Sequence, residues 1–301
     1  MRTAHLAGHV NAALDHVDGA LRSAAADPLR RDCEHLRGRI IGRSGSAEVA
    51  RDTLVAVAAR CEGDQPVLAA EMLADAVLPA LRAGRPAEAV RIGRRAARLA
   101  SDGGGHAEFS AKIALGTALI LAGEYAEGAA LVDAAAERGE LAADRQERAY
   151  LGAGLVLAGR HASGRRVLVG LVDEVRAAGA VSVLPYALIR LADVEIETGR
   201  WPAAEAALHE ARGFARETGQ AADYGLALGA VAWLDAARGH DEECRAHVDE
   251  ALELAVLGEE SAAARHGREG RGPLRLLGVV PEALKRLLRV VAATGERVGL
   301  N

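Results

Sequence analysis

The chain has few aromatic side chains and few cysteines, and both shortages limit its architecture. Aromatic residues make up 3% of the 301 residues, although 50% of the chain is apolar. Alanine, leucine, valine and glycine therefore supply the core, as is typical of close-packed helices with small residues at their contacts. The three cysteines, Cys33, Cys61 and Cys244, form no CxxC pair. This favours packed thiols in a reducing cytoplasm over a disulfide framework.

Long hydrophobic runs and an excess of positive charge are missing as well. No stretch approaches the roughly 18 consecutive apolar residues of a membrane span, and the first twenty residues do not resemble a signal peptide. The net charge is -5, so the chain as a whole offers no surface for nucleic acid. Only Lys112 and Lys285 are lysines, and the arginine excess indicates a high-GC bacterial genome. We expect a cytoplasmic protein that binds neither membrane nor nucleic acid.

The sequence also lacks the motifs of the common catalytic sites. It has no GK[ST] loop for nucleotide phosphates, no GxSxG elbow and no HExxH helix. His240, Cys244 and His247 have the spacing of metal ligands, but Cys244 also occupies a packing position. We interpret them as one buried thiol flanked by two histidines. We therefore predict no catalytic residues, no metal and no cofactor.

What the sequence does contain is a repeat marked by glycines. Glycines recur at intervals of 36 to 40 residues, and a small residue stands five positions after each. A glycine permits a positive φ at a helix end, and the small residue lets a second helix approach the first. The pattern predicts an all-α fold, a right-handed superhelical solenoid of six helix pairs with a partial unit at each end. The glycines are Gly8, Gly45, Gly84, Gly123, Gly159, Gly199, Gly239 and Gly278.

The clearest unit runs from Leu188 to Arg212, with Trp201, Ala204, Leu208 and Ala211 after its turn. This unit resembles the tetratricopeptide (TPR) repeat. We assign residues 1–257 to a TPR-like repeat domain. Residues 258–301, rich in glycine and arginine, would form an irregular final repeat and a helix from Pro281 to about Ala293. They contain the one basic run, Arg265 to Arg275, which we interpret as a solvated segment.

The segments 27–40, 68–100 and 114–128 extend the resemblance. In this order they resemble the helical-repeat region of the large ATP-binding LuxR-type transcriptional regulators. In that family the repeats lie between a nucleotide-binding module and a DNA-binding helix-turn-helix. The resemblance implies that this chain is a sensor module and a fragment of a longer regulator.

The candidate binding surface is the concave face of the solenoid. Carrying over the TPR geometry, inward positions fall about thirteen, ten and six residues before each turn glycine. They mix charges and hydroxyls with two of the rare aromatics, which suits a small-molecule effector or a partner peptide. An alternative is that Tyr186 and Trp233 only fill gaps between repeats. The candidate groove residues are His35, Arg39, Glu71, Thr117, Tyr186, Asp193 and Trp233, with Asp32, Ser110 and Gln146 at equivalent positions.

Three functions fit these observations. The first is a non-catalytic ligand- or partner-binding sensor of a LuxR-type regulator, acting by an allosteric change of the superhelix. The second is a stand-alone protein-interaction scaffold. The third is an enzyme of secondary metabolism, which requires Glu71, His35 and Asp193 to converge in the groove. An end of the solenoid without a capping unit would also permit a homodimer.

Overall fold

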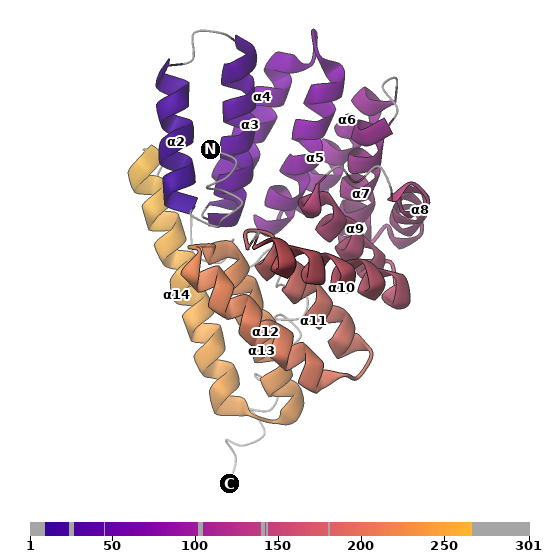
Figure 1. Ribbon diagram of the computed structural model, residues 1–301, viewed down its shortest axis with the longest axis vertical. Coiled ribbons are helices and arrows are strands. Elements are labelled where there is room, and N and C mark those ends of the chain that lie inside the picture. Colours follow the sequence, from indigo (N-terminus) through magenta and orange to yellow (C-terminus); the bar gives the residue numbers. More distant parts are fainter. Residues whose placement is uncertain are drawn as a thin grey trace.

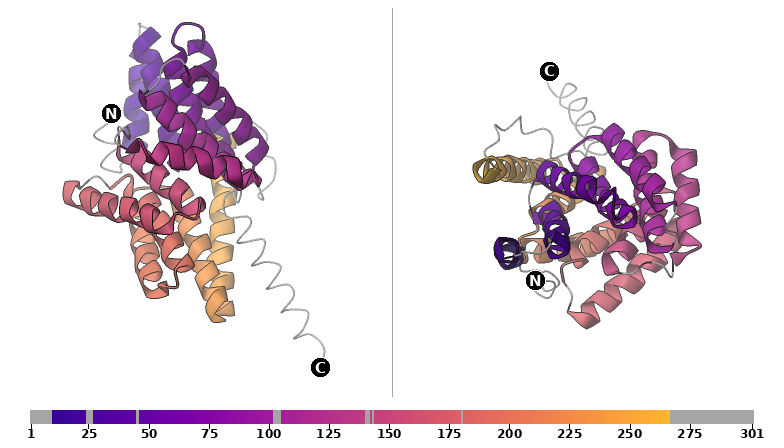
Figure 2. Two further views of the ribbon diagram at one scale, coloured as in Figure 1. Left: turned by 90° about the vertical axis from the view of Figure 1, so that its right-hand side faces the viewer. Right: turned by 90° about the horizontal axis from the view of Figure 1, so that it is seen from above.

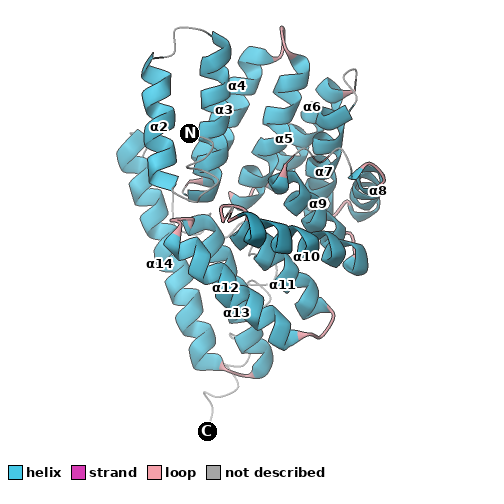
Figure 3. Cartoon of the chain, viewed as in Figure 1, coloured by secondary structure: helices cyan, strands magenta, loops and turns pink. Residues whose placement is uncertain are grey.

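The computed structural model describes residues 10–23, 27–44, 46–101, 105–139, 142, 144–179 and 181–266. Within these ranges the chain forms thirteen helices and no strand (Figure 3). Helix α2 (Val10–Ser23) is the first helix of the described residues. The predicted all-α solenoid is therefore confirmed. The turn glycines Gly8, Gly45 and Gly278 and the expected helix from Pro281 lie outside the described residues.

Six helix pairs follow α2, which agrees with the number of full repeats predicted from the glycines. Each pair packs against the next, and successive pairs wind around a common axis (Figures 1 and 2). The pairs are α3 (Asp27–Ser44) with α4 (Ala47–Cys61), α5 (Pro66–Arg82) with α6 (Pro86–Ala100), α7 (Gly105–Ala122) with α8 (Tyr125–Ala136), α9 (Arg145–Leu157) with α10 (His161–Ala178), α11 (Leu184–Glu197) with α12 (Trp201–Glu217), and α13 (Ala221–Arg238) with α14 (Asp241–His266).

Local sequence signals set the ends of these helices. The side chains of Ser46 and Asp144 cap α4 and α9 by accepting hydrogen bonds from backbone N–H groups of the first turn. The turn inside each pair depends on glycine, as at Gly199, where φ is +75°. A side chain would be strained in this left-handed conformation, so the glycine spacing fixes where each first helix stops.

The small residue after each turn is where the two helices of a pair meet. Ala50, Ala89 and Ala204 are fully buried there. At Gly128 a Cβ atom would lie 2.6 Å from the carbonyl oxygen of Gly116 on the facing helix. This approach leaves no room for any side chain, which explains why glycine replaces alanine in that repeat.

The last described helix extends beyond the boundary expected from the sequence. We expected α14 to end near residue 257, but it continues through Gly258 to His266. One glycine costs a helix only about 1 kcal/mol relative to alanine, which is not enough to end it. The rest of the stretch predicted to be irregular, from residue 267 onward, lies outside the described residues.

The first helix of each pair lines the inside of the solenoid. Helices α3, α5, α7, α9, α11 and α13 contact one another in succession, and α3 also contacts α13. The winding thus brings the first full repeat against the last, across the axis of the superhelix. The functional candidates lie on this enclosed inner surface.

Candidate binding site on the inner surface

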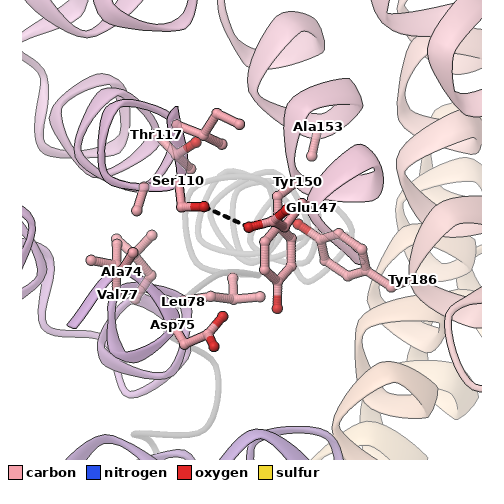
Figure 4. A pocket seen from close by; sticks show the side chains of 13 residues that line it. Ala74, Asp75, Val77, Leu78, Ser110, Thr117, Glu147, Tyr150, Ala153 and Tyr186 are labelled. Carbon is pink, nitrogen blue, oxygen red and sulfur yellow. Dashed lines mark hydrogen bonds between the residues drawn. The ribbon is translucent and has the colours of Figure 1, made fainter. Parts of the chain in front are cut away.

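Two adjoining cavities occupy the inner surface. The first, which we call the apolar pocket, lies between α5, α7, α9 and α11 and encloses about 520 Å³ of space, part of it open to solvent (Figure 4). Its lining consists of Ala74, Asp75, Val77, Leu78, Leu81, Ser110, Ile113, Ala114, Thr117, Glu147, Tyr150, Ala153 and Tyr186. Four consecutive repeats contribute to it, so the pocket exists only in the assembled solenoid.

The second, which we call the arginine cavity, lies on the side of α3 and α13. Asp75, Leu78, Tyr150 and Tyr186 separate it from the apolar pocket, because they line both. The remaining lining is Gly38, Arg39, Gly42, Arg43, Leu54, Pro79, Arg82, Gln146 and Asp223. The two cavities therefore share a wall but differ sharply in charge.

The arginines of the second cavity close the solenoid across its axis. Arg39 donates to Asp144 and to Gln146, each at 2.9 Å. Arg43 donates to the backbone oxygen of Ser182 at 2.6 Å and to Gln146 at 2.7 Å. These bonds join α3 to segments more than a hundred residues away in the sequence. They link the first full repeat to the fourth repeat and to the segment before the fifth, across the axis of the superhelix.

Arg82 makes the most deeply buried of these links. Its guanidinium donates to Asp223 Oδ1 at 2.5 Å and to the backbone oxygen of Gly42 at 2.8 Å. The side chains of Arg82 and Asp223 are 6% and 0% exposed. A buried charge must be paired, since desolvation of an isolated charge costs several kcal/mol. This ion pair thus ties α5 to α13.

Arg43 differs from its neighbours because no carboxylate lies within ion-pairing distance of it among the described residues. Burial lowers the pKa of Arg43, and the nearby guanidinium groups of Arg39 and Arg82 lower it further. Its hydrogen bonds go to neutral oxygens, which satisfy its donors without cancelling its charge. The arginine cavity is consequently positive relative to the apolar pocket.

The apolar pocket has acidic groups on its wall and no basic ones. Asp75 is held from behind, where His35 Nε2 lies 2.8 Å and Arg39 Nε 3.6 Å from its Oδ2 atom. Burial raises the pKa of Asp75, but Arg39 and His35 outweigh burial and hold the pKa below its ordinary value. Asp75 is therefore a carboxylate at neutral pH.

Glu147 carries the second negative charge of the pocket. Its Oε1 atom accepts from Ser110 at 2.5 Å, the bond drawn in Figure 4, and lies 2.7 Å from His106 Nε2. The other ring nitrogen of His106 lies 2.9 Å from Glu71 Oε1. Burial lowers the pKa of His106, but the two glutamates more than reverse this and raise it. A histidine bridge thus holds Glu71 and Glu147 at the edge of the pocket.

Two tyrosines form the wall between the cavities. Their rings meet edge to face with centroids 5.6 Å apart (Figure 4). Tyr150 accepts a hydrogen bond from the amide of Gln146, whereas the hydroxyl of Tyr186 has no hydrogen-bond partner among the described residues. Tyr186 is only 8% exposed, and burial raises its pKa. The hydroxyl oxygen itself is not among the fully enclosed atoms that lack a partner, so it is open to an occupant of the cavities that the ring lines.

The structure distributes the predicted groove residues over several places. Thr117 and Tyr186 line the apolar pocket, and Arg39 lines the arginine cavity. His35 contacts Asp75 and Glu71 contacts His106, both at the margins. Asp193 pairs with Arg190 at 3.0 Å, and burial raises its pKa.

Trp233 lines neither cavity. Its ring packs edge to face on Trp201, with centroids 6.3 Å apart. Trp201 belongs to the preceding repeat, so this contact joins two repeats. Tyr186 packs on Tyr150.

The sequence interpretation missed most residues that build the two cavities. Asp75 and Tyr150, which line both cavities, stand nine residues before a turn glycine, and Arg43 and Arg82 stand two before one. With the positions thirteen and six before the glycine, these form one helical stripe at steps of four, three and four. The position ten before the glycine, on which the prediction relied, holds Ala149 and Ile189, which are fully buried in the packing. A strict helical stripe includes the four missed residues, whereas Glu147, twelve before its glycine, falls outside it.

Comparison with known proteins identifies the fold and nothing narrower. The sequence matches no protein-family model and no curated protein. The structure is similar to the crystal structure of Rap protein complexed with Competence and Sporulation Factor. The TM-score is 0.58 at 12% identity, over 94% of this chain and 80% of that one. It also matches nearly identical TPR-like repeats from Podosopora anserina, with a TM-score of 0.40 at 15% identity, over 65% of this chain and 99% of that one.

The fold is thus that of TPR-like helical-repeat proteins. In the part of the chain that the structure describes, no helix is long and apolar enough to cross a membrane. No cluster of histidine, cysteine or acidic residues suited to a metal ion occurs in that same part. Cys244 is buried against Ala232, and His247 contacts Asp235 at 2.8 Å.

Proposed function

We propose that this chain is a non-catalytic protein-interaction scaffold that holds a short segment of a partner protein in the apolar pocket. The observation that carries the proposal is the hydroxyl of Tyr186, which lies in the pocket wall and makes no hydrogen bond to a described residue. A bound segment would supply the missing hydrogen bond and cover the apolar wall. Pockets that combine an apolar surface with a few placed polar groups are the usual form of binding sites.

The fold supports this proposal. Superhelical repeats use their concave surface to hold extended partners. The structurally similar Rap protein was crystallised in complex with Competence and Sporulation Factor. By analogy, the inner surface of this chain is the place where a partner would bind.

The arrangement of the acids supports a non-catalytic role. The enzyme hypothesis requires Glu71, His35 and Asp193 to converge. In the structure they contact three different residues, His106, Asp75 and Arg190. Groups committed to separate partners do not form an acid–base pair around one reacting atom.

A second candidate is a sensor for a small effector. The lining of the pocket favours it, since a mostly apolar wall with a few placed polar groups is typical of small-molecule sites. A ligand touching four repeats would favour one curvature of the solenoid and so change what its ends contact. The role in a LuxR-type regulator is a finer form of this candidate and rests on the sequence resemblance alone.

A peptide library tests the scaffold proposal. Random heptapeptides are selected on the wild-type protein and on Ala114→Phe, which places a ring inside the pocket. Ser110→Trp, at its edge, serves as a second blocking variant. We expect peptides that bind the wild type with micromolar Kd and lose at least tenfold in affinity for either variant. Equal binding to all three proteins, with thermal unfolding showing that they are folded, would contradict the proposal.

A further inference from the structure

The charge on the wall of the apolar pocket is one-sided. Asp75 and Glu147 line it, and no lysine, arginine or histidine does. The guanidinium groups of Arg39, Arg82 and Arg190 have carboxylates of their own, whereas Arg43, in the adjoining arginine cavity, has none among the described residues. Arg82 pairs with Asp223, Arg190 with Asp193, and Arg39 with both Asp75 and Asp144. An occupant of the pocket therefore contacts the negative side chains of the wall directly, whereas the positive side chains lie on the far side of that wall.

Asp75 keeps one oxygen available. His35 and Arg39 both approach its Oδ2 atom, and no described residue donates to Oδ1. The side chain is 19% exposed and lies at the pocket wall (Figure 4). A carboxylate oxygen in a partly desolvated pocket is a strong acceptor for a charged donor.

Two hydroxyl groups add further unpaired acceptors. Tyr186 and Thr117 both line the pocket, and neither makes a hydrogen bond to a described residue. The Tyr186 side chain is more than nine-tenths buried, and its ring extends toward Tyr150 and Glu147 (Figure 4). A donor group in the pocket would find these oxygens in addition to Asp75.

The rest of the wall is aliphatic. Val77, Leu81, Ile113 and Ala153 form a surface without polar atoms on their side chains. A chain of methylene groups packs well against such a surface, as the stem of a lysine does when its charged end stays in a polar environment. The pocket thus combines an apolar wall with an anionic, hydroxyl-bearing patch.

We infer that the occupant of the apolar pocket is an alkylammonium group, supplied by a lysine side chain of the bound partner segment. This inference rests on the proposed function and names the chemistry that the partner must carry. Asp75 Oδ1 is the charged acceptor for one N–H of the ammonium, and the hydroxyl of Tyr186 is a second acceptor on the wall that both residues line. Arginine fits less well, because its planar fork favours two parallel bonds to one carboxylate, and Oδ2 of Asp75 is already engaged.

Binding of capped amino acids tests the inference. Nα-acetyl-lysine N-methylamide, the equivalent norleucine and glutamate compounds, and n-pentylamine are titrated into the labelled full chain at pH 7, followed by NMR. We expect capped lysine to bind at least tenfold more tightly than capped norleucine, which has the stem without the charge. Capped glutamate should not bind in the pocket.

Three variants locate the site. Tyr186→Phe removes one hydroxyl without touching the arginines, and should weaken capped lysine about threefold to tenfold. Asp75→Asn should weaken it at least tenfold; its unfolding curve is measured alongside, since Asp75 also holds His35 and Arg39. Glu217→Gln, an exposed carboxylate on α12, is the matched control and should have no effect.

Failure of this inference and failure of the proposed function give different experimental results. Equal binding of capped lysine and capped norleucine, both abolished by Ala114→Phe, would overturn the inference and leave the scaffold proposal standing. Tighter binding of n-pentylamine than of capped lysine would overturn the assignment to a partner segment in favour of a free amine. Absence of any binding that responds to Ala114→Phe, from these probes and from the peptide library, would overturn both proposals.

Discussion

The apolar pocket and the arginine cavity share Asp75, Leu78, Tyr150 and Tyr186, yet their polar groups are used differently. In the arginine cavity each guanidinium donates through a terminal nitrogen to at least one oxygen of the chain, although the Nε atoms of Arg39 and Arg82 are buried without a partner. In the apolar pocket, Tyr186, Thr117 and Asp75 Oδ1 keep unused hydrogen-bonding capacity. The arginine cavity, which is the more satisfied side, holds the solenoid closed, and the acceptors of the apolar pocket are available for a partner.

The largest effect is expected from breaking the satisfied side. Arg82→Ala leaves Asp223 buried without its partner, and should lower the free energy of unfolding by about 3–5 kcal/mol. Urea denaturation measures this. Arg94→Ala, which removes an exposed ion pair with Glu124, is the matched control and should cost at most about 1 kcal/mol.

A double variant of the Arg82–Asp223 ion pair gives a sharper test. The double variant Arg82→Met with Asp223→Leu removes both charges together, so it should regain most of the stability lost in Arg82→Ala. If Arg82→Ala proves no more destabilising than Arg94→Ala, the link across the superhelix axis does not have the role assigned to it.

A smaller effect should distinguish the two tyrosines of the shared wall. Tyr150→Phe removes the acceptor of the Gln146 amide and should cost about 1 kcal/mol of stability. Tyr186→Phe removes a hydroxyl that has no partner, so stability should stay within about 0.5 kcal/mol of the wild type or rise. Thermal unfolding of both variants gives the comparison. A larger loss for Tyr186→Phe would mean that its hydroxyl already has a partner in the chain.

The smallest effect concerns the edge of the pocket and depends on pH. Because Glu71 and Glu147 raise the pKa of His106 above its unfolded value near 6.5, protonation favours the folded state. This contribution is fully present below pH 6.5 and is lost as the pH rises through the folded pKa. The stability difference between wild type and His106→Gln should therefore shrink with rising pH. A difference that is constant or grows would argue against the histidine bridge.

The sequence was sufficient for the architecture because the repeat depends on local rules. A turn glycine and a small residue five positions later specify each helix pair, and the helices from α3 to α14 follow that pattern. The pattern did not predict that α14 continues beyond residue 257, because one glycine such as Gly258 is not enough to end a helix.

The site could be predicted only in part. Arg39, Thr117 and Tyr186 were placed on the cavities by their distance from the turn glycine alone. The links from Arg43 to Ser182 and from Arg82 to Asp223 depend on the curvature of the whole superhelix. Curvature accumulates from small rotations between repeats, which no local pattern reveals. The unpaired state of Tyr186 likewise emerges only when all neighbouring oxygens are placed.

One NMR titration tests the distinction between the two cavities most directly. A lysine-bearing peptide selected from the library is added to protein labelled in its tyrosine rings and arginine side chains. Our account predicts that the ring signals of Tyr186 shift with saturation while the Nη–H signals of Arg82 stay in place, since these groups already donate to Gly42 and Asp223. A shift at Arg82 with no change at Tyr186 would contradict the account.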